Sequence, residues 1–394
     1  MNLSKQKLPK KYFKAGKECY LDPIWKRLVY ATPEETVRQQ ILSYLINDLK
    51  VPKGLIRREV PLSHYSVKAT GKADILIEKI EDGFPVPFAV IECKAPGVFL
   101  GEKEIDQIVE HANEICCDYI MISNGHESFL YHYEEAERKF LPINEFPVYE
   151  DMVKSKDEEY IIEPVPERIP LDQLEKTIIE DRSFGESDNI GYNMPIDKAV
   201  MCLNLWECLL DVNVTMPTGK YRIFDLIEDL GIRLLSCGKT SGGVFSGPYR
   251  SFLIEFKGEN QIISFGFSPY STRAKPDIEK TSLNVAIDTD ESAHHSLQLV
   301  IDDNVISNGD EFLFYHHGRI SVGNRGGGRV DELKKEMTEN CPYIITGDKI
   351  FLGKLKNNKL FKLTDDCVKE LIENLISYAL IREVYKNKKI KNKD

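Results

Sequence analysis

The sequence has little of what marks zinc-binding, secreted or membrane proteins. Its 9 cysteines are an odd number, are scattered along 394 residues, and include no pair with the C-x-x-C spacing. A zinc ribbon and a disulfide framework are therefore both poorly supported. No segment approaches the roughly 18 consecutive apolar residues of a membrane span, and no apolar stretch follows the basic N-terminus as a signal peptide requires. We expect a protein of the reducing cytoplasm, without a membrane segment.

The sequence has fewer basic residues than acidic ones. The chain has 52 lysines and arginines against 63 aspartates and glutamates, a formal net charge of −11. This balance argues against a surface that binds polyanions everywhere, but contact with nucleic acid needs only a local basic strip. Arg57 and Arg58 form one such strip, and the lysines of the tail at 386–393 form another. The tail is read more simply as a solvated, frayed chain end.

The remaining composition is that of an ordinary globular protein, with 42% hydrophobic and 29% charged residues. At about 150 residues per domain, the length predicts two domains or three. An acidic, proline-containing stretch at 148–168 indicates a boundary. We expect a first domain at residues 1–150, a linker at 151–168, and a second domain at 169–394 that recognises substrate or a partner.

The first domain shows the pattern of a mixed α/β fold. A helix should begin at Thr32, which can cap it, with Pro33 in the first turn and Glu35 completing a capping box. The order that follows is helix, three strands, helix and two strands, which predicts layers packed on one central sheet. The expected strands are 55–62, 72–78, 87–94, 119–123 and 128–133, and the second helix is 102–116.

The second domain is expected to be α+β and rich in strands. Its helices are predicted at 171–181, 196–212 and 365–386, where apolar residues recur at helical spacing. A strand-rich stretch lies between them at 242–353, with turns at 257–258 and 308–309.

The strand at 87–94 combines apolar and charged residues in an unusual way. Because side chains alternate across a strand, Phe88, Val90, Glu92 and Lys94 should share one face. The strand is apolar on both faces before Glu92, which is typical of a central strand. A central strand should not carry a carboxylate and an ammonium without partners, because burying either charge is costly.

The preceding strand supplies a second carboxylate. If the two strands pair, Asp74 and Glu92 lie close together, and two such groups repel unless a cation sits between them. Two carboxylates, a backbone carbonyl and waters suit Mg²⁺, which would polarise a scissile phosphate and lower the pKa of a bound water. Lys94 is in phase with Glu92 and would orient the water or stabilise developing negative charge. The plainer alternative is a structural ion pair between Lys94 and one of the acids.

Six blocks in order carry a resemblance that favours the site. They are TPEETVRQQILSYL, RREV, GKADILI, AVIECKAP, DQIVEHANE and MISNG. The stretch from about Asp22 to Tyr133 resembles the N-terminal nuclease domain of the motor subunit of type I restriction enzymes, a member of the PD-(D/E)xK nuclease superfamily. That resemblance implies a restriction-endonuclease-like core in which Asp74, Glu92 and Lys94 bind metal and activate water.

The following helix matches the family in part. Gln107 stands where the family has the Gln of its Gln-x-x-x-Tyr block and is expected to position substrate, but His111 replaces the Tyr. A histidine can still touch phosphate. Glu59 is a further candidate catalytic acid at the end of the first strand, or else an exposed strand-end charge. The roughly 230 residues after the first domain are too few for the family's helicase and lack its motifs.

Other motifs in the second domain are weaker. The Gly238-Lys239-Thr240 sequence lacks the Walker A spacing, so we expect no ATP. The histidine pairs 294–295 and 316–317 are expected to be surface or core residues, because adjacent side chains on a strand point apart. The glycine-rich stretch at 318–329 could hold phosphates with its arginines or form a flexible hairpin connection. Those arginines are Arg319, Arg325 and Arg329.

These patterns together predict an Mg²⁺-dependent endonuclease, with Mn²⁺ as a substitute metal. Its substrate would be nucleic acid, in the first instance DNA, and its role restriction or anti-phage defence. Double-strand cleavage by a domain with one site usually needs two copies, so a homodimer is expected, or else an activating partner protein. The alternative is a nucleic-acid-binding or partner-binding protein whose nuclease core is silent or partner-activated.

Overall fold

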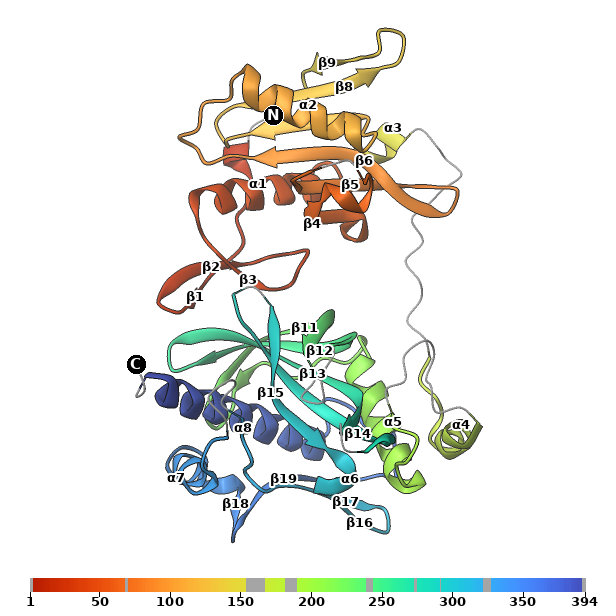
Figure 1. Ribbon diagram of the computed structural model, residues 1–394, viewed down its shortest axis with the longest axis vertical. Helices are drawn as coiled ribbons and strands as arrows, with labels where there is room; N and C mark the ends of the chain where they lie inside the picture. The colour runs from red at the N-terminus through yellow and green to blue at the C-terminus, as the bar shows by residue number, and fades with distance from the viewer. Residues whose placement is uncertain are drawn as a thin grey trace. The chain divides into compact units, whose positions relative to one another are not determined.

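The computed structural model divides into two compact units, Met1–Pro164 and Val165–Asp394, each described here by itself (Figure 1). No helix in the part that it describes is long and apolar enough to cross a membrane. The structure describes residues 3–67, 70–153, 167–180, 190–238, 244–272, 275–290, 292–321 and 327–391.

A six-stranded mixed sheet forms the centre of the first unit. Its strand order is β4-β5-β6-β7-β8-β9, so neighbours in the sheet are also consecutive in the chain. The β6–β7 pair is parallel and the other pairs are antiparallel. The strands are β4 (Ile56–Pro61), β5 (Lys72–Glu81), β6 (Phe84–Cys93), β7 (Tyr119–Ser123), β8 (Ser128–Glu134) and β9 (Lys139–Ile143).

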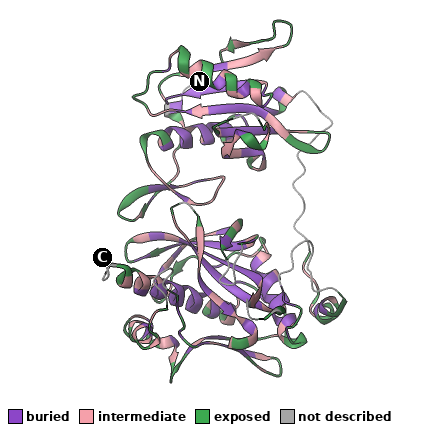
Figure 2. Ribbon diagram, viewed as in Figure 1, coloured by how far each residue is buried: buried purple, intermediate pink, exposed green. Residues whose placement is uncertain are grey.

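Two helices pack on this sheet, one against each apolar cluster that it carries (Figure 1). Helix α1 (Pro33–Asn47) contributes Ile41 and Leu45 to a cluster with Ile91 of β6. Helix α2 (Glu102–Glu114) contributes Ile108 to a second cluster, which includes Val90 of β6. Strand β6 is therefore central and buried on both faces, as its sequence predicted (Figure 2). The predicted order of helices and strands is confirmed from α1 to β8, and β9 is a further strand that the sequence did not predict.

The start of α1 confirms half of the predicted capping box. Thr32 caps the helix and its side chain accepts a hydrogen bond from the Glu35 N–H at 3.1 Å. The reciprocal half is wrong, because the Thr32 N–H donates instead to the carbonyl of Tyr30. The Glu35 carboxylate turns toward Arg38 and Arg58.

Phe88 is not on the face predicted for it. It packs in the α1 cluster beside Ala89, whereas Val90 packs in the α2 cluster. The reason is an irregularity in the pairing of β5 with β6, where Ile77 pairs with Ala89 but Glu78 pairs with Pro87. Phe88 is the extra residue of this bulge, which shifts the alternation by one.

The first unit contains a small sheet that the sequence did not predict. It has the order β1-β2-β3 and is antiparallel. The strands are β1 (Lys11–Lys14), β2 (Lys17–Leu21) and β3 (Leu28–Tyr30). They are short, and the last two flank the buried Asp22.

The linker expected at 151–168 was predicted too long, because residues at both of its ends belong to the folded units. Helix α3 (Tyr149–Val153) places Met152 in the core of the first unit. Arg168 belongs to the second unit, where it donates to the carbonyl of Phe361 at 2.5 Å. Most of the expected linker lies outside the described residues.

The second unit contains a six-stranded antiparallel sheet and a four-stranded antiparallel sheet. The predicted turn at Lys257-Gly258 joins two long strands, and both residues have positive φ angles. The larger sheet has the order β10 (Gly219–Lys220), β11 (Asp225–Gly238), β12 (Val244–Phe256), β13 (Glu259–Thr272), β14 (Lys275–Asp288) and β15 (Ala293–Val300). The smaller has the order β16 (Val305–Asn308), β17 (Glu311–His316), β19 (Lys349–Lys356) and β18 (Ile345–Thr346).

Helices complete the α+β arrangement of this unit. The predicted final helix is α8, whose buried residues join a large apolar cluster with both sheets. The predicted helix at 171–181 is a 3₁₀ turn, Leu171–Gln173, followed by a shorter α-helix. The helices are α4 (Leu174–Glu180), α5 (Ile196–Leu210), α6 (Ile301–Asn304), α7 (Val330–Asn340) and α8 (Asp366–Lys391).

Strand β11 lies entirely before the predicted strand-rich stretch, and α6 and α7 interrupt that stretch. Two register shifts explain why β11 was missed, one between Leu226 and Glu228 and one between Asp229 and Gly231. Each shift breaks the period-two alternation on which a strand is recognised in sequence.

Candidate active site

Asp74 and Glu92 lie at the same end of two paired strands. The antiparallel register of β5 with β6 pairs Ile75 with Ile91. Asp74, just before Ile75, and Glu92, just after Ile91, are therefore neighbours at this end of the two strands. Both carboxylates are largely buried, with 18% and 15% of the side chain exposed. Burial raises the pKa of Glu92, and the neighbouring charge of Asp74 raises it further. The predicted pairing of these strands is therefore confirmed, and it brings the two acids together.

The two oxygens of Asp74 have different partners. Oδ2 accepts a hydrogen bond from the backbone N–H of Cys93 at 2.7 Å. Oδ1 accepts one from Nη2 of Arg38, also at 2.7 Å. The first bond fixes the Asp74 carboxylate against the end of β6, and the second joins it to α1.

Glu92 is only partly satisfied. Its Oε1 accepts a hydrogen bond from Nζ of Lys94 at 2.8 Å. Its Oε2 is buried and has no hydrogen-bond partner among the described residues. A buried carboxylate oxygen without a donor or a cation is costly, so this atom marks a place where a positively charged group would be favourable.

Lys94 is held as a cation. Burial alone would lower its pKa, but the hydrogen bond to Glu92 and the charges of Glu92 and Asp74 outweigh it, and the pKa is raised. A lysine in this state donates hydrogen bonds and offsets negative charge, and it does not act as a base near neutral pH.

Arg38 gathers the remaining acids of the site. Its guanidinium lies 2.5 Å from Glu35 Oε2 and 3.1 Å from Glu34 Oε1 on its own helix. Across the sheet it lies 2.7 Å from Asp74 Oδ1 and 3.7 Å from Glu59 Oε1. Burial by itself would lower the pKa of Arg38, but the nearby acids, Asp74 first among them, raise it.

Glu59 adopts an unusual backbone conformation beside this cluster. Its φ is +46°, which non-glycine residues rarely adopt. The ladder between β4 and β5 pairs Arg58 with Ile75 and Val60 with Ala73, and it skips Glu59. Such strain often lies at functional sites, and here it places a half-exposed carboxylate within reach of Arg38.

Arg58 does not form the basic strip predicted for it. Its side chain is fully buried, forms an ion pair with Asp22, and lies 3.0 Å from Glu35 Oε2. It is unavailable to a phosphate, so its prediction as a nucleic-acid contact is wrong. Arg57 is 43% exposed and pairs with the buried Glu78 at 2.9 Å.

Gln107 and His111 lie one turn apart on α2. Gln107 is exposed. The Nε2 of His111 would lie 3.5 Å from a Cβ placed on Gly71, which directly precedes β5. His111 thus packs near the strand end that carries Asp74, and its Nδ1 is buried without a hydrogen-bond partner in the described structure.

The three arginines predicted in the glycine-rich stretch belong to the second unit. Arg319 is exposed. Arg329 is 70% exposed and pairs with Asp331 at 2.8 Å. Arg325 lies outside the described residues. Their role in binding nucleic acid remains a prediction.

Arg38 is the site residue that the sequence analysis overlooked. The sequence did contain a signal for Arg38. Glu34 and Glu35 lie four and three residues before Arg38 on a predicted helix, and side chains at this spacing touch. Its contact with Asp74 joins residues 36 apart in the chain, and no local pattern indicates that contact.

The first unit is thus a mixed-sheet α/β domain with Asp, Glu and Lys side chains gathered at the end of two paired strands. Residues 33–147 match the model of the family described as type I restriction enzyme R protein N terminus. This match confirms the resemblance and supports a restriction-type nuclease role for the domain. It ends before the second unit begins. Comparison with curated proteins and with solved structures gave no match.

Proposed function

We propose that the first unit is a metal-dependent endonuclease of the restriction-endonuclease-like fold and that DNA is its substrate. The observation that carries this proposal is the buried Oε2 of Glu92, which has no partner among the described residues and lies beside Asp74 and Lys94. The family match over residues 33–147 supports it independently.

A divalent cation fits the donor set at this point. Mg²⁺ prefers oxygen ligands and keeps several waters, so two carboxylates suffice as its protein anchors. Among the described residues no group of three acid, histidine or cysteine side chains is placed to hold a metal, so the proposed site rests on two carboxylates. Asp74 and Glu92 would hold Mg²⁺, or Mn²⁺ in its place, and Asp74 would then exchange its bond to Arg38 for the metal.

The metal, when bound, would polarise the scissile phosphate and lower the pKa of a water molecule. Lys94 would donate to the phosphate oxygens as negative charge develops there, since its ammonium stays protonated. Glu59 would accept a hydrogen bond from the attacking water. Gln107, exposed on α2, would position the substrate.

The family match also bears on partners and role. R proteins of type I restriction enzymes act on nucleic acid within multisubunit complexes, so we propose a partner protein or a second copy of this chain, and a role in restriction or anti-phage defence. We propose a cytoplasmic location and no use of ATP in cleavage.

The direct experiment is a cleavage assay on end-labelled duplex DNA, single-stranded DNA and RNA of one sequence. Mg²⁺, Mn²⁺ and EDTA are compared for the wild-type chain and for Asp74→Asn, which keeps the size of the side chain but removes its charge. We expect metal-dependent cutting of duplex DNA that Asp74→Asn loses. Cutting that persists in EDTA or in Asp74→Asn would exclude the proposal.

One observation favours a second candidate, a nuclease core that is silent until a partner acts. The bond between Arg38 and Asp74 engages the oxygen that a metal would need. In this candidate a partner or the substrate draws Arg38 away. Cleavage by wild type only after a restriction-type partner is added would distinguish it from a free-standing enzyme.

A further inference from the structure

The second unit contains a cavity of about 760 Å³ that plays no part in the nuclease site. Its lining residues come from β13, β14, β15, α6, the end of β17, the described residues between β17 and α7, the start of α7, and α8. Ser321 and Gly327, which pair across a β-bridge, are among the residues that line it. Ligand pockets of proteins commonly measure ~300–1,000 Å³, so the cavity has room for a small molecule of nucleotide size.

The charged residues of the wall are mostly cationic. Lys280, Arg319, Arg382 and Lys386 line the cavity, against a single acid, Asp303. Asp303 is already paired with Lys280 at 2.5 Å, and Lys386 is paired with Glu383 at 2.7 Å, so Arg319 and Arg382 carry the excess. Such an excess of positive charge in a chain of net charge −11 is local, and it favours an anion in this cavity.

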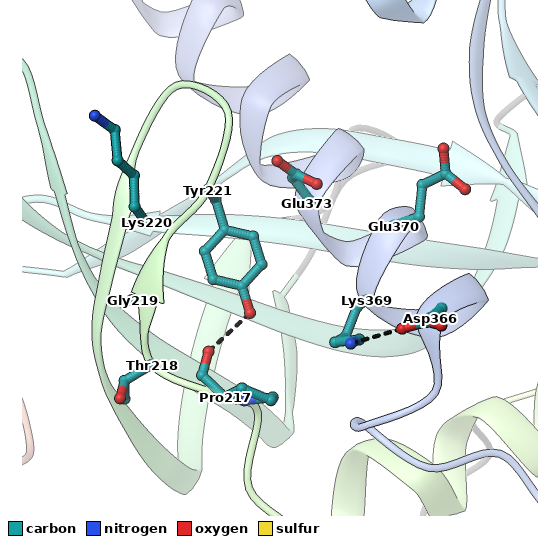
Figure 3. Close-up of a pocket in the computed structure, with 9 residues that line it drawn as sticks. All are labelled: Pro217, Thr218, Gly219, Lys220, Tyr221, Asp366, Lys369, Glu370 and Glu373. Atoms are coloured by element: carbon teal, nitrogen blue, oxygen red, sulfur yellow. Dashed lines mark hydrogen bonds and ion pairs between the residues drawn. The ribbon is translucent and has the colours of Figure 1, made fainter.

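A second cavity of the same unit provides the contrast (Figure 3). It measures about 370 Å³ and lies between the segment 217–221 and the start of α8. Its two lysines, Lys220 and Lys369, face three acids, and Lys369 is paired with Asp366 at 2.7 Å. The charges there balance or lean negative, so that cavity does not select an anion.

Arg382 is the central feature of the larger cavity. It is buried, and it donates from Nε to the carbonyl of Ser296 at 2.9 Å. Its Nη1 donates to the carbonyl of Arg319 at 2.9 Å and to the Tyr378 hydroxyl at 3.2 Å. None of these partners is a carboxylate. A buried guanidinium without a counter-ion is costly, and an anion in the cavity would compensate it.

Two histidines add neutral donors. Nδ1 of His316 accepts the N–H of Gly318 at 3.0 Å, so the ring hydrogen is on Nε2. Nδ1 of His317 accepts the N–H of Arg319 at 3.4 Å, which gives the same tautomer. Burial lowers the pKa of both rings, and the charges of Arg382 and Arg319 lower them further. These rings therefore offer N–H donors near neutral pH without adding charge.

We propose that this cavity binds a small phosphorylated ligand of nucleotide size. Arg382 and Arg319 would hold its phosphate groups, because a guanidinium can offer two parallel donors to phosphate oxygens. The apolar residues of the wall, Leu297, Val300 and Ile320, would contact the remainder of the molecule. The proposal is independent of the nuclease site and makes the second unit a ligand-binding domain.

Isothermal titration calorimetry on the full chain in EDTA tests this with four probes: inorganic pyrophosphate, ATP, adenosine and a single-stranded oligonucleotide. We expect pyrophosphate and ATP to bind at 150 mM salt and adenosine not to bind. If pyrophosphate and ATP bind with equal affinity, the phosphate groups alone account for binding. If ATP binds more tightly than pyrophosphate, the apolar wall also contributes. Either result supports the proposal.

Variants locate the binding. Arg319→Glu should weaken pyrophosphate and ATP by at least tenfold, since this exposed side chain has no ion-pair partner among the described residues. Lys356→Glu makes the same charge reversal on β19, outside the cavity wall, and should change little. Arg382→Gln should also weaken binding; if it fails to fold, Arg319→Glu alone decides.

Three results would overturn the proposal. The first is no binding of pyrophosphate or ATP at millimolar concentration. The second is an affinity that Arg319→Glu leaves unchanged. The third is binding of the oligonucleotide alone, which would identify the cavity as part of a nucleic-acid path.

Discussion

Nη2 of Arg38 lies 2.7 Å from Oδ1 of Asp74, while Oε2 of the neighbouring Glu92 has no partner in the described structure. Both predicted metal ligands are thus in ion pairs, Asp74 with Arg38 and Glu92 with Lys94, and one oxygen of Glu92 remains unsatisfied in the described structure. A metal bound at Asp74 would compete with the guanidinium for the same carboxylate. If the proposed metal binds, its binding and the stability of the first unit should depend on each other.

Arg38→Gln should therefore change how the first unit responds to metal. Without metal, Glu35 and Asp74 lose their shared counter-charge, and breaking a buried ion pair in this way costs about 3–5 kcal/mol. Metal no longer has to displace an arginine, so Mn²⁺ should stabilise the variant more than the wild type. The measurement is urea unfolding with EDTA and with Mn²⁺.

Lys139→Gln is the control for this prediction. It removes an exposed ion pair with Glu137 and should cost no more than about 1 kcal/mol with or without metal. If Mn²⁺ stabilised Arg38→Gln and wild type equally, the competition between Arg38 and metal would be refuted.

Lys94→Ala should separate metal binding from cleavage. The ammonium would act on the developing charge of the phosphate and is not a proposed metal ligand, so Mn²⁺ should still bind. Single-turnover cleavage should fall by roughly 10²–10³. Lys94→Arg should recover part of the rate, and Lys139→Ala should keep all of it. A wild-type rate in Lys94→Ala would remove Lys94 from the chemistry.

Asp229→Ala should destabilise the second unit strongly. Asp229 forms a buried pair with Arg250, whose side chain is 1% exposed and which also donates to the carbonyls of Asp211 and Val214. Removing the acid leaves a buried guanidinium charge uncompensated, at a cost of about 3–5 kcal/mol. Asp310→Ala, which removes the exposed pair with Lys356, should cost no more than about 1 kcal/mol. If Asp229→Ala lost as little stability as Asp310→Ala, the backbone carbonyls alone would be enough to stabilise the buried guanidinium of Arg250.

The stability of the second unit should fall as the pH drops below about 6.5. Burial lowers the pKa of His295 to about 4, with a smaller contribution from His294, and lowers that of His316 to about 2, with further contributions from Arg382 and His317. Unfolded histidines titrate near 6.5. Below that pH the unfolded chain binds protons that the folded chain refuses, so the stability present above pH 6.5 is lost progressively toward pH 4.

Each histidine contributes a slope of at most about 1.4 kcal/mol per pH unit. Urea unfolding between pH 7 and 5, in buffer without phosphate, measures this slope. His295→Gln should have a shallower slope than wild type, since glutamine does not titrate. An identical slope in the two proteins would show that His295 is not held neutral by the fold.

The parts of the candidate site that depend on residues close together in the chain could be predicted from the sequence. Alternation and the spacing of Glu92 and Lys94 identified one strand, and apolar alternation around Asp74 identified its neighbour. Two adjacent strands joined by a short turn usually pair, which was enough to bring the acids together. Phe88 shows the limit of this reasoning, because a bulge of one residue reverses the face of a side chain and leaves no clear mark in the sequence.

Other features depend on contacts between distant parts of the chain. Arg38 reaches Asp74 only because α1 packs across the sheet, and Arg58 is buried only because Asp22 and Glu35 meet it there. The cavity of the second unit joins residues of β15, β17 and α8. Basic residues spread so far along an acidic chain form no pattern until the fold assembles them.

The most direct test of the central claim is the conversion of supercoiled plasmid DNA by wild type and by Glu92→Gln. The two proteins differ by one charge at the atom that the described structure leaves without a partner. We predict that wild type nicks or linearises the plasmid with Mg²⁺ and not with EDTA, and that Glu92→Gln, folded to the same extent, does neither. Equal cutting by both proteins would contradict the assignment of this site.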